Sequence, residues 1–194
     1  ERLQLHGERN IMSKTATDEQ VSEIVNTMDH YLYDSSIGGY RQNTNFLEVK
    51  TDLGRMFGFA YGNKENGSVF SHMAVMYAYS LYSRDFATEG YKVLKSLYLH
   101  SMDFNRSRIY PGIPEYFNKR GRGMYHYLTG SASWYMLTLV TQMFGVRGEY
   151  GDLVLNPKLL AEQFDEEGNA SISIVFADKL LTVIYENKNM EEIG

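Results

Sequence analysis

The sequence predicts an α+β fold in which helices come first and antiparallel strands follow, and three observations lead to this prediction. Apolar residues recur at helical spacing in several stretches of residues 17–144. After Gly145 the period changes to short segments rich in β-branched residues, in which apolar and polar positions alternate. Helices followed by strands are typical of segregated layers. We therefore expect a helical domain over residues 1–147 and a small C-terminal β-strand domain over residues 148–194.

The first helix is predicted over residues 17–33. It opens with Thr17-Asp18-Glu19-Gln20, a capping-box pattern in which two side chains satisfy backbone N–H groups at the helix start. The residues that then share one helical stripe are Val21, Ile24, Val25, Met28 and Leu32. This spacing is typical of an amphipathic helix that buries one face.

Residues 34–67 break this pattern with closely spaced glycines, so we expect a long, ordered and irregular segment there. Such a segment is usually functional, because ordering its backbone has an entropic cost. Residues 68–84 are apolar on nearly every side, which predicts a helix enclosed by others. Asp85 or Thr88 is expected to cap the next helix, and the two helices should form an antiparallel hairpin.

The rest of the chain alternates between irregular and regular segments. Residues 104–130 are again irregular, and Ser131 is expected to open a further helix that Gly145 ends. Strands are predicted at residues 153–155, 171–176 and 180–185.

Composition and charge exclude several classes of protein. The 194 residues carry 19 Lys and Arg against 24 Asp and Glu, and this net charge of −5 leaves no overall basic surface for nucleic acid. No cysteine is present, so disulfides, zinc fingers, iron–sulfur clusters and thiol catalysis are excluded. The five histidines show no paired metal-ligand spacing, and we expect neither a metal nor a cofactor.

The sequence also bears on the location of the protein. No apolar run approaches the roughly 18 to 20 residues that cross a bilayer, and the start lacks the pattern of a signal peptide. We therefore expect a cytoplasmic protein without a membrane or nucleic-acid partner. The chain begins with Glu1 instead of Met, which suggests a processed chain or a piece of a longer one.

One candidate site is the entrance to the helix expected from Ser131. Residues 127–131, Tyr-Leu-Thr-Gly-Ser, lead into a helix N-terminus, where unpaired N–H groups and the helix dipole favour an anion. Thr129 would add a hydroxyl, Gly130 would permit close backbone approach, and Arg122 lies a few residues upstream. The alternative is that Ser131 simply caps the helix, as most such serines do.

A second candidate is the segment Lys64-Glu65-Asn66-Gly67 with His72 in the first turns of the apolar helix. Charged groups beside an apolar helix need partners, because an unpaired buried charge costs several kcal/mol. Lys64 and Glu65 could satisfy each other. A lone histidine is more often a hydrogen-bonded core residue, but the whole cluster favours a polar cleft.

Three motifs together resemble a known family. Residues 64–67 (Lys-Glu-Asn-Gly) with 70–72 (Phe-Ser-His), residues 110–116 (Tyr-Pro-Gly-Ile-Pro-Glu-Tyr) and residues 127–134 (Tyr-Leu-Thr-Gly-Ser-Ala-Ser-Trp) resemble the inverting phosphorylases of glycoside hydrolase family 94. Cellobiose, chitobiose and 1,2-β-oligoglucan phosphorylases are members. The resemblance continues to residue 165 and so covers nearly the whole chain.

The resemblance implies a fold and a set of ligand contacts. Residues 1–147 would be the last helices of an (α/α)6 barrel, and residues 148–194 part of a C-terminal β domain. Lys64 and Glu65 would bind the sugar in the subsite beside the scissile bond. Inorganic phosphate, a co-substrate and not a cofactor, would be held by His72, Thr129 and Gly130.

The implied reaction is the phosphorolysis of a β-linked gluco-oligosaccharide to an α-sugar 1-phosphate. Phosphate attacks the anomeric carbon in place of the activated water of an inverting hydrolase, so one carboxylic acid is enough. In the family this acid is an aspartate upstream of the segment that the chain resembles. The chain is therefore expected to hold no catalytic residue and to be inactive alone, and the full-length enzyme to be a homodimer.

Two further inferences complete the resemblance. Gly112 and Ile113 stand where cellobiose phosphorylase-like members have a phosphate-binding glutamine, which makes cellobiose a less expected substrate than another β-glucan or disaccharide. Two alternatives remain open: the phosphorylase-like domain of a cyclic β-1,2-glucan synthase, whose parent would lie at a membrane, and a non-catalytic carbohydrate-binding fragment.

Overall fold

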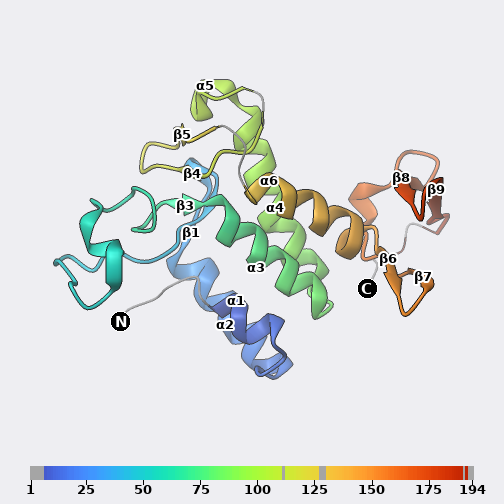
Figure 1. Ribbon diagram of the computed structural model, residues 1–194, viewed down its shortest axis with the longest axis horizontal. Helices are drawn as coiled ribbons and strands as arrows, with labels where there is room; N and C mark the ends of the chain where they lie inside the picture. Colours follow the sequence, from blue (N-terminus) through green and yellow to red (C-terminus); the bar gives the residue numbers. More distant parts are fainter. Residues whose placement is uncertain (1–6, 111, 127–129, 190, 192–194) are drawn as a thin grey trace. The chain divides into compact units, whose positions relative to one another are not determined.

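The computed structural model describes residues 7–110, 112–126, 130–189 and 191. The chain divides into two compact units, Glu1–Met136 and Leu137–Gly194. Helices dominate the first unit and antiparallel hairpins the second (Figure 1). This mixture of helices and small antiparallel sheets agrees with the predicted α+β class, while the (α/α)6 barrel and the domain boundary after residue 147 stay predictions.

The first unit contains most of the helices and two small sheets. Its elements are α1 (Gly7–Met12), α2 (Asp18–Tyr31), β1 (Tyr33–Asp34), η1 (Ser35–Ile37), β2 (Gly39–Tyr40), η2 (Gly54–Gly58), β3 (Val69–Phe70), α3 (Ser71–Ser83), α4 (Ala87–Met102), α5 (Phe104–Ser107), β4 (Tyr116–Phe117) and β5 (Gly123–Met124), and α6 (Gly130–Thr138) begins in it. No helix among the described residues is both long and apolar enough to span a bilayer.

The core of this unit lies where α3 and α4 pack side by side (Figure 1). The buried apolar residues of these two helices include Val75, Tyr77, Ala78, Leu81, Val93, Leu94 and Leu97. Helix α3 is buried on most of its surface, as its sequence predicts. Burying these side chains removes apolar surface from water, which is the main favourable contribution to the stability of the unit.

Both expected caps of α4 are wrong, since Asp85 precedes the N-cap and Thr88 lies inside the helix. The N-cap is Phe86, and no side chain of the described residues makes a capping hydrogen bond there. Asp85 instead adopts a left-handed conformation with φ of 66°, and its N–H donates to the carbonyl of Tyr82 at 3.1 Å. The short connection between the two helices therefore places Asp85 in the turn, one residue too early to act as the cap.

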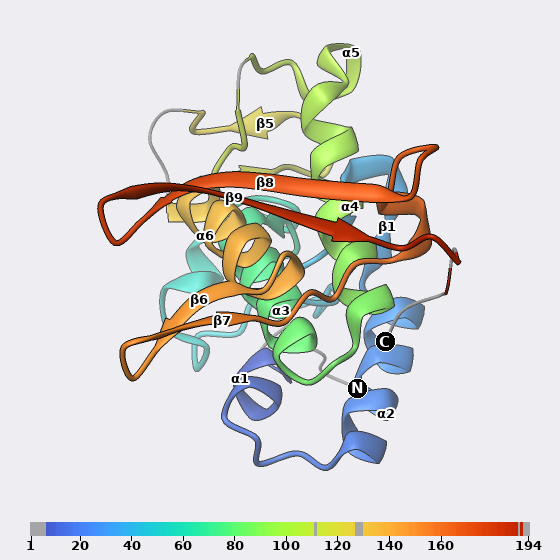
Figure 2. The same cartoon turned by 90° about the vertical axis from the view of Figure 1, so that its right-hand side faces the viewer.

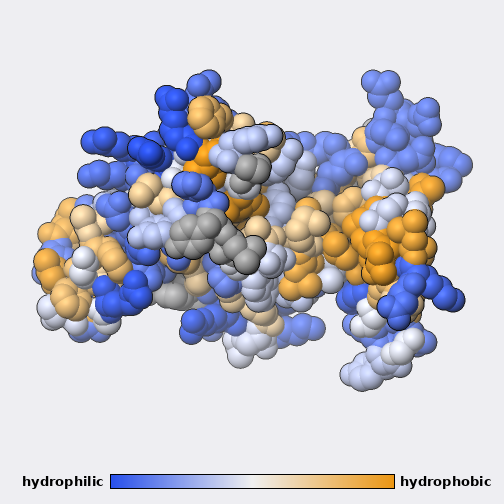
Figure 3. Space-filling model, turned by 45° about the horizontal axis from the view of Figure 1, so that its top comes forward, coloured by the Kyte–Doolittle hydropathy of each residue, from blue (hydrophilic) through white to orange (hydrophobic). Residues whose placement is uncertain are grey.

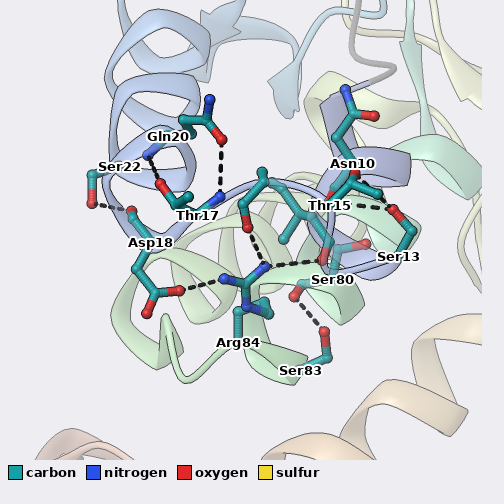
Figure 4. A network of polar contacts seen from close by, with 12 residues as sticks. Asn10, Ser13, Thr15, Thr17, Asp18, Gln20, Ser22, Ser80, Ser83 and Arg84 are labelled. Carbon is teal, nitrogen blue, oxygen red and sulfur yellow. Dashed lines mark hydrogen bonds and ion pairs between the residues drawn. The ribbon is translucent and has the colours of Figure 1, made fainter.

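Helix α2 begins with the predicted capping box (Figure 4). The Gln20 N–H donates to the Thr17 hydroxyl at 3.3 Å, and the Thr17 N–H donates to the Gln20 side chain at 2.9 Å. Arg84, just after α3, donates to the carbonyl of Ala16 at 3.0 Å and also pairs with Asp18. These contacts attach the start of α2 to the end of α3.

A short three-stranded sheet, β3-β4-β5, joins segments that the sequence predicts to be irregular. Phe70 pairs with Tyr116, and Tyr116 pairs with Met124, all antiparallel. The first residue of α3, Ser71, donates its N–H to the carbonyl of Glu115 at 2.9 Å. The sheet thereby fixes the residues before β4 beside the N-terminus of α3.

The second unit consists mainly of two antiparallel hairpins (Figure 2). Its elements after α6 are a π-helical turn η3 (Leu139–Met143), β6 (Val146–Glu149), β7 (Asp152–Leu155), η4 (Ala161–Gln163), β8 (Asn169–Phe176) and β9 (Lys179–Glu186). Strands β7, β8 and β9 confirm the predicted segments. Gly145 ends the preceding helix as expected, with φ of 66° and a position where a Cβ would lie 1.8 Å from the carbonyl oxygen of Asn156.

Candidate functional site

Three segments that are far apart in the sequence meet at the N-terminal end of α3. The β3 strand leads directly into this helix, and the residues before β4 lie beside it. The start of α6 is held close as well, because the Ser131 hydroxyl donates to the carbonyl of Pro114 at 3.3 Å. The motifs that carry the family resemblance therefore converge on one place in the first unit.

His72 and Gly130 are direct neighbours at this place. A Cβ built on Gly130 would lie 3.3 Å from Cε1 and 3.5 Å from Nδ1 of the His72 ring. A larger residue at position 130 would therefore crowd the imidazole. The Trp134 ring lies 5.9 Å from that of His72, centroid to centroid, one turn into α6. Thr129, the third predicted phosphate contact, lies outside the described residues.

The His72 side chain is half-buried and has an unused polar atom. Its Nε2 is shielded from water and has no hydrogen-bond partner in the part of the chain that the structure describes. Burial lowers the pKa of His72 below its ordinary value, so the imidazole is neutral near pH 7. A histidine that serves only the core usually has a partner at such an atom, whereas this ring is available to a ligand.

Lys64 forms its ion pair with Glu115 and not with Glu65, the partner that the sequence suggests as one alternative. The Lys64 Nζ lies 3.6 Å from Oε2 of Glu115 and 3.9 Å from the centre of the Tyr125 ring. Burial acts to lower the pKa of Lys64, but the Glu115 carboxylate and Tyr125 outweigh it and raise that pKa. The ammonium group is therefore a fixed positive charge at the site.

Glu65 and Glu115 each present a buried acceptor. Glu65 pairs with the exposed Arg55 at 3.5 Å, yet its Oε2 is buried without a hydrogen bond to any described residue. The Oε2 of Glu115 is also buried, and Lys64 is too distant for a hydrogen bond. Because a buried oxygen without a donor is costly, both atoms suit the hydroxyl groups of a ligand.

The loop that carries Lys64 and Glu65 is held rigidly. The Asn43 side chain accepts from the Gly67 N–H at 2.8 Å, and Arg41 donates to the Gly67 carbonyl at 2.8 Å. Gly67 has φ of 70°, and a Cβ there would lie 2.0 Å from the Tyr61 ring. Only glycine fits this position. The site is therefore preorganised before any ligand arrives.

The structure gives two residues, Glu115 and Arg122, a different place from the one that the sequence suggested. Glu115 forms the ion pair with Lys64, although the sequence shows no spacing that would reveal it; its place in the motif 110–116 is the one available signal. Arg122 instead lies in the β4–β5 turn, where it lines a separate surface pocket. No group of three or more acidic or histidine residues in the described chain is arranged to hold a metal ion.

The site can act on a ligand that combines negative charge with hydroxyl groups. A neutral imidazole and the first N–H groups of α6 can donate to an anion. The Lys64 ammonium and the two carboxylates can bind the hydroxyls of a neighbouring polar ring. The arrangement supplies binding and orientation.

Comparison with known proteins gives one family and two relatives. The family whose model matches is described as the glycosyl hydrolase 94 superfamily, catalytic domain, and the match covers residues 6–145. Cellobionic acid phosphorylase from Neurospora crassa is 24% identical over 161 residues, which are 77% of this chain and 20% of that protein. Solabiose phosphorylase from Paenibacillus borealis is 23% identical over 192 residues, 95% of this chain and 24% of that protein. The chain thus spans about a fifth to a quarter of these relatives.

Proposed function

Because the chain belongs to the glycosyl hydrolase 94 superfamily, we propose that it forms part of an inverting glycoside phosphorylase. The match confirms the family that the three motifs indicate, and both relatives are phosphorylases. The proposed reaction converts a β-linked gluco-oligosaccharide and inorganic phosphate into an α-sugar 1-phosphate. The general acid is expected from chain upstream of residue 1, so this segment alone is inactive.

The observation that carries the proposal is the contact between His72 and Gly130. The His72 imidazole, whose buried Nε2 has no hydrogen-bond partner among the described residues, lies beside Gly130, the first residue of α6. Backbone N–H groups at a helix start favour an anion. We assign inorganic phosphate to this place, bound by His72, Gly130 and the adjacent Thr129. The helix N-terminus stabilises its negative charge, and the imidazole donates one hydrogen bond from Nε2.

Lys64, Glu65 and Glu115 provide the sugar side of the site. The ammonium group can donate to ring hydroxyls, and the buried oxygens of the two glutamates can accept from them. Because the loop and the sheet fix these groups, substrate binding costs little reorganisation. We assign them to the sugar beside the scissile bond.

In the proposed reaction a phosphate oxygen forms a bond to the anomeric carbon as the glycosidic C–O bond breaks. The proton of the general acid passes to the leaving oxygen, and the attack from the opposite face inverts the configuration. The residues of this chain hold phosphate and sugar in line, which lowers the entropic part of the barrier. The N-terminus of α6 also stabilises the negative charge of the phosphate as it approaches the sugar.

The test uses the full-length protein that contains this chain. Incubation with β-linked gluco-oligosaccharides and phosphate is expected to release sugar 1-phosphate, and NMR should identify the α-anomer. His72→Asn is expected to lower kcat/KM for phosphate by about 10²-fold, the usual loss for one such donor. Arg9→Gln, an exposed change on α1, serves as the matched control.

Two outcomes would overturn the proposal. Release of free sugar at a rate that does not depend on phosphate would identify a hydrolase. Binding of oligosaccharide without any turnover in the full-length protein would instead support the carbohydrate-binding alternative.

A further inference from the structure

A second charged pocket lies at the turn of the β4–β5 hairpin, away from the residues assigned above. It has a volume of about 570 Å³, and its lining residues are Ser36, Asn105, Arg106, Arg108, Arg120 and Arg122. They come from η1, α5 with its C-cap, and the hairpin turn. Helix α5 and this hairpin are neighbours (Figure 1), and hydrophilic side chains gather over them (Figure 3).

The pocket concentrates positive charge in a protein whose net charge is −5. Four of its six lining residues are arginines, and none is acidic. Arg106 forms a partly exposed ion pair with Asp103 at 3.3 Å. Arg108, Arg120 and Arg122 have no carboxylate partner among the described residues. Like charges that line one pocket repel one another, and an anionic ligand would reduce that repulsion.

The wall of the pocket is anchored by a buried histidine. His100 is 4% exposed, and its Nε2 lies 2.7 Å from the carbonyl oxygen of Gly121, at the centre of the hairpin turn. Gly121 has φ of 73°, and a Cβ there would lie 3.0 Å from the His100 ring and 3.2 Å from the Ser36 carbonyl. The turn is therefore packed tightly against α4 and η1.

Local hydrogen bonds and backbone conformation also fix the positions of the individual arginines. The Asn118 side chain accepts from the N–H of Arg120 at 2.9 Å and from that of Arg122 at 3.2 Å. Arg108 adopts a left-handed conformation, with φ of 56°, at the C-cap of α5. The backbone thus presents the exposed guanidinium groups from defined positions, which lowers the entropic cost of binding a ligand.

We propose that this pocket binds a phosphate-bearing small molecule, either inorganic phosphate or a phosphomonoester. Guanidinium groups bind phosphate through paired N–H···O hydrogen bonds, and several arginines together match a dianion. The volume is within the range of about 300 to 1,000 Å³ typical of small-molecule sites and exceeds the needs of a single phosphate ion. A phosphomonoester with an organic group fills it better.

This site is separate from the one proposed for the reaction. Glu115 and Tyr125 flank the open end of the β4–β5 hairpin, where the Glu115 N–H donates to the Tyr125 carbonyl at 3.0 Å. Arg120 and Arg122 lie at the closed end of the same hairpin. The proposal is therefore independent of the proposed function, and a protein without phosphorylase activity could still show it.

The test is a titration of the 194-residue chain with inorganic phosphate and, separately, with glucose 1-phosphate. Calorimetry measures the binding, and NMR spectra monitor the backbone amide signals of residues 118–122. Both compounds are expected to shift these signals, glucose 1-phosphate at the lower concentration. The double change Arg120→Gln and Arg122→Gln is expected to weaken this binding at least about tenfold, in line with the loss of charge-assisted hydrogen bonds.

Two controls make the result specific. Lys119→Gln removes one positive charge from the same turn, outside the pocket lining, where the double change removes two. It is expected to leave the affinity within about twofold, as is usual for an exposed charge. His72→Asn should not change the shifts at residues 118–122. The proposal is overturned if neither compound shifts these signals, if Lys119→Gln loses as much affinity as the double change, or if only an RNA oligonucleotide binds there.

Discussion

The half-buried imidazole of His72 makes stability depend on pH. Burial lowers its pKa in the folded state below the unfolded value of about 6.5. Protonation therefore favours the unfolded state: the contribution of His72 to stability is complete above the unfolded pKa and is lost as the pH falls through the folded one. The free energy of unfolding should decrease between pH 7.5 and 5.

Urea denaturation at several pH values measures this effect. His72→Gln is expected to flatten part of the decrease, because glutamine does not titrate. His30→Gln, a change of an exposed histidine on α2, is the matched control and should keep the wild-type slope. Equal slopes for wild type and His72→Gln would contradict the prediction.

Glu115 gives a second prediction at the residue scale. Glu115→Gln keeps the size of the side chain but removes the charge that faces Lys64 at 3.6 Å. On the proposed function, KM for the oligosaccharide should rise about tenfold, the typical loss for a hydrogen bond to a charged group, while KM for phosphate changes little. Steady-state kinetics of the full-length protein measure both constants.

The control for this change is Glu23→Gln, an exposed carboxylate on α2. It should leave both constants unchanged. An equal rise of both KM values in Glu115→Gln would point to general damage of the site and would argue against a role in sugar binding.

Individual side-chain partners are what the sequence predicts least well. It singles out Lys64, Glu65, His72 and Gly130, but two of its suggestions about partners are not what the structure shows. Lys64 pairs with Glu115 from a distant part of the chain, and Arg122 lines another pocket. Such pairs depend on which loops the fold brings together, and no local spacing encodes that.

At the scale of elements, a matched pair of glycine substitutions tests whether the loop that ends at Gly67 is rigid. Gly67 has a φ of 70°, and the Cβ of an alanine there would lie 2.0 Å from the Tyr61 ring. Gly54 has a similar φ of 60°, but the Cβ of an alanine there would have no atom within 4 Å. Gly54→Ala should cost about 1 kcal/mol of unfolding free energy from backbone strain alone. Gly67→Ala should cost at least about 2 kcal/mol, since overpacking adds to it.

Urea denaturation of the two variants checks this difference. Equal losses would show that the Tyr61 ring moves away without cost, and the argument that the loop is rigid would then fail.

Elements were predictable where the chain offers a long periodic pattern. The capping box at Thr17 and the all-round apolar stretch of α3 led to helices close to those observed. Strands β3, β4 and β5 have two residues each, too few to show an alternation, and pairing between distant segments creates them. Strand β6 was missed because Val146 is its one apolar residue besides Gly148.

At the scale of the whole molecule, burial predicts how local stability is distributed in the first unit. Helices α3 and α4 contain side chains that are almost fully buried, while Leu47 and Val49 are 88% and 72% exposed. Amide hydrogen exchange should therefore be slowest in α3 and α4 and fastest at residues 45–58. Mass spectrometry of exchanged peptides measures this order, and equal protection of the two regions would contradict it.

The family, and with it the expected chemistry, came from motifs that share one order along the chain, and the family match covers residues 6–145. Periodicity gave the α+β class but could not give the barrel, which depends on how helices close around an axis. The homodimer and the cytoplasmic location stay predictions, since they depend on surfaces and signals that these patterns do not encode.

The β4–β5 hairpin has a consequence for regulation. Its open end carries Glu115 and Tyr125, and its closed end carries two of the arginines of the pocket around Ser36. Only two paired residues on each strand separate these ends, so a ligand in the pocket and a ligand beside Glu115 would contact the same short hairpin. Thermodynamic linkage makes any such effect symmetric: the factor by which one occupant alters the affinity for the other must equal the factor in the reverse direction.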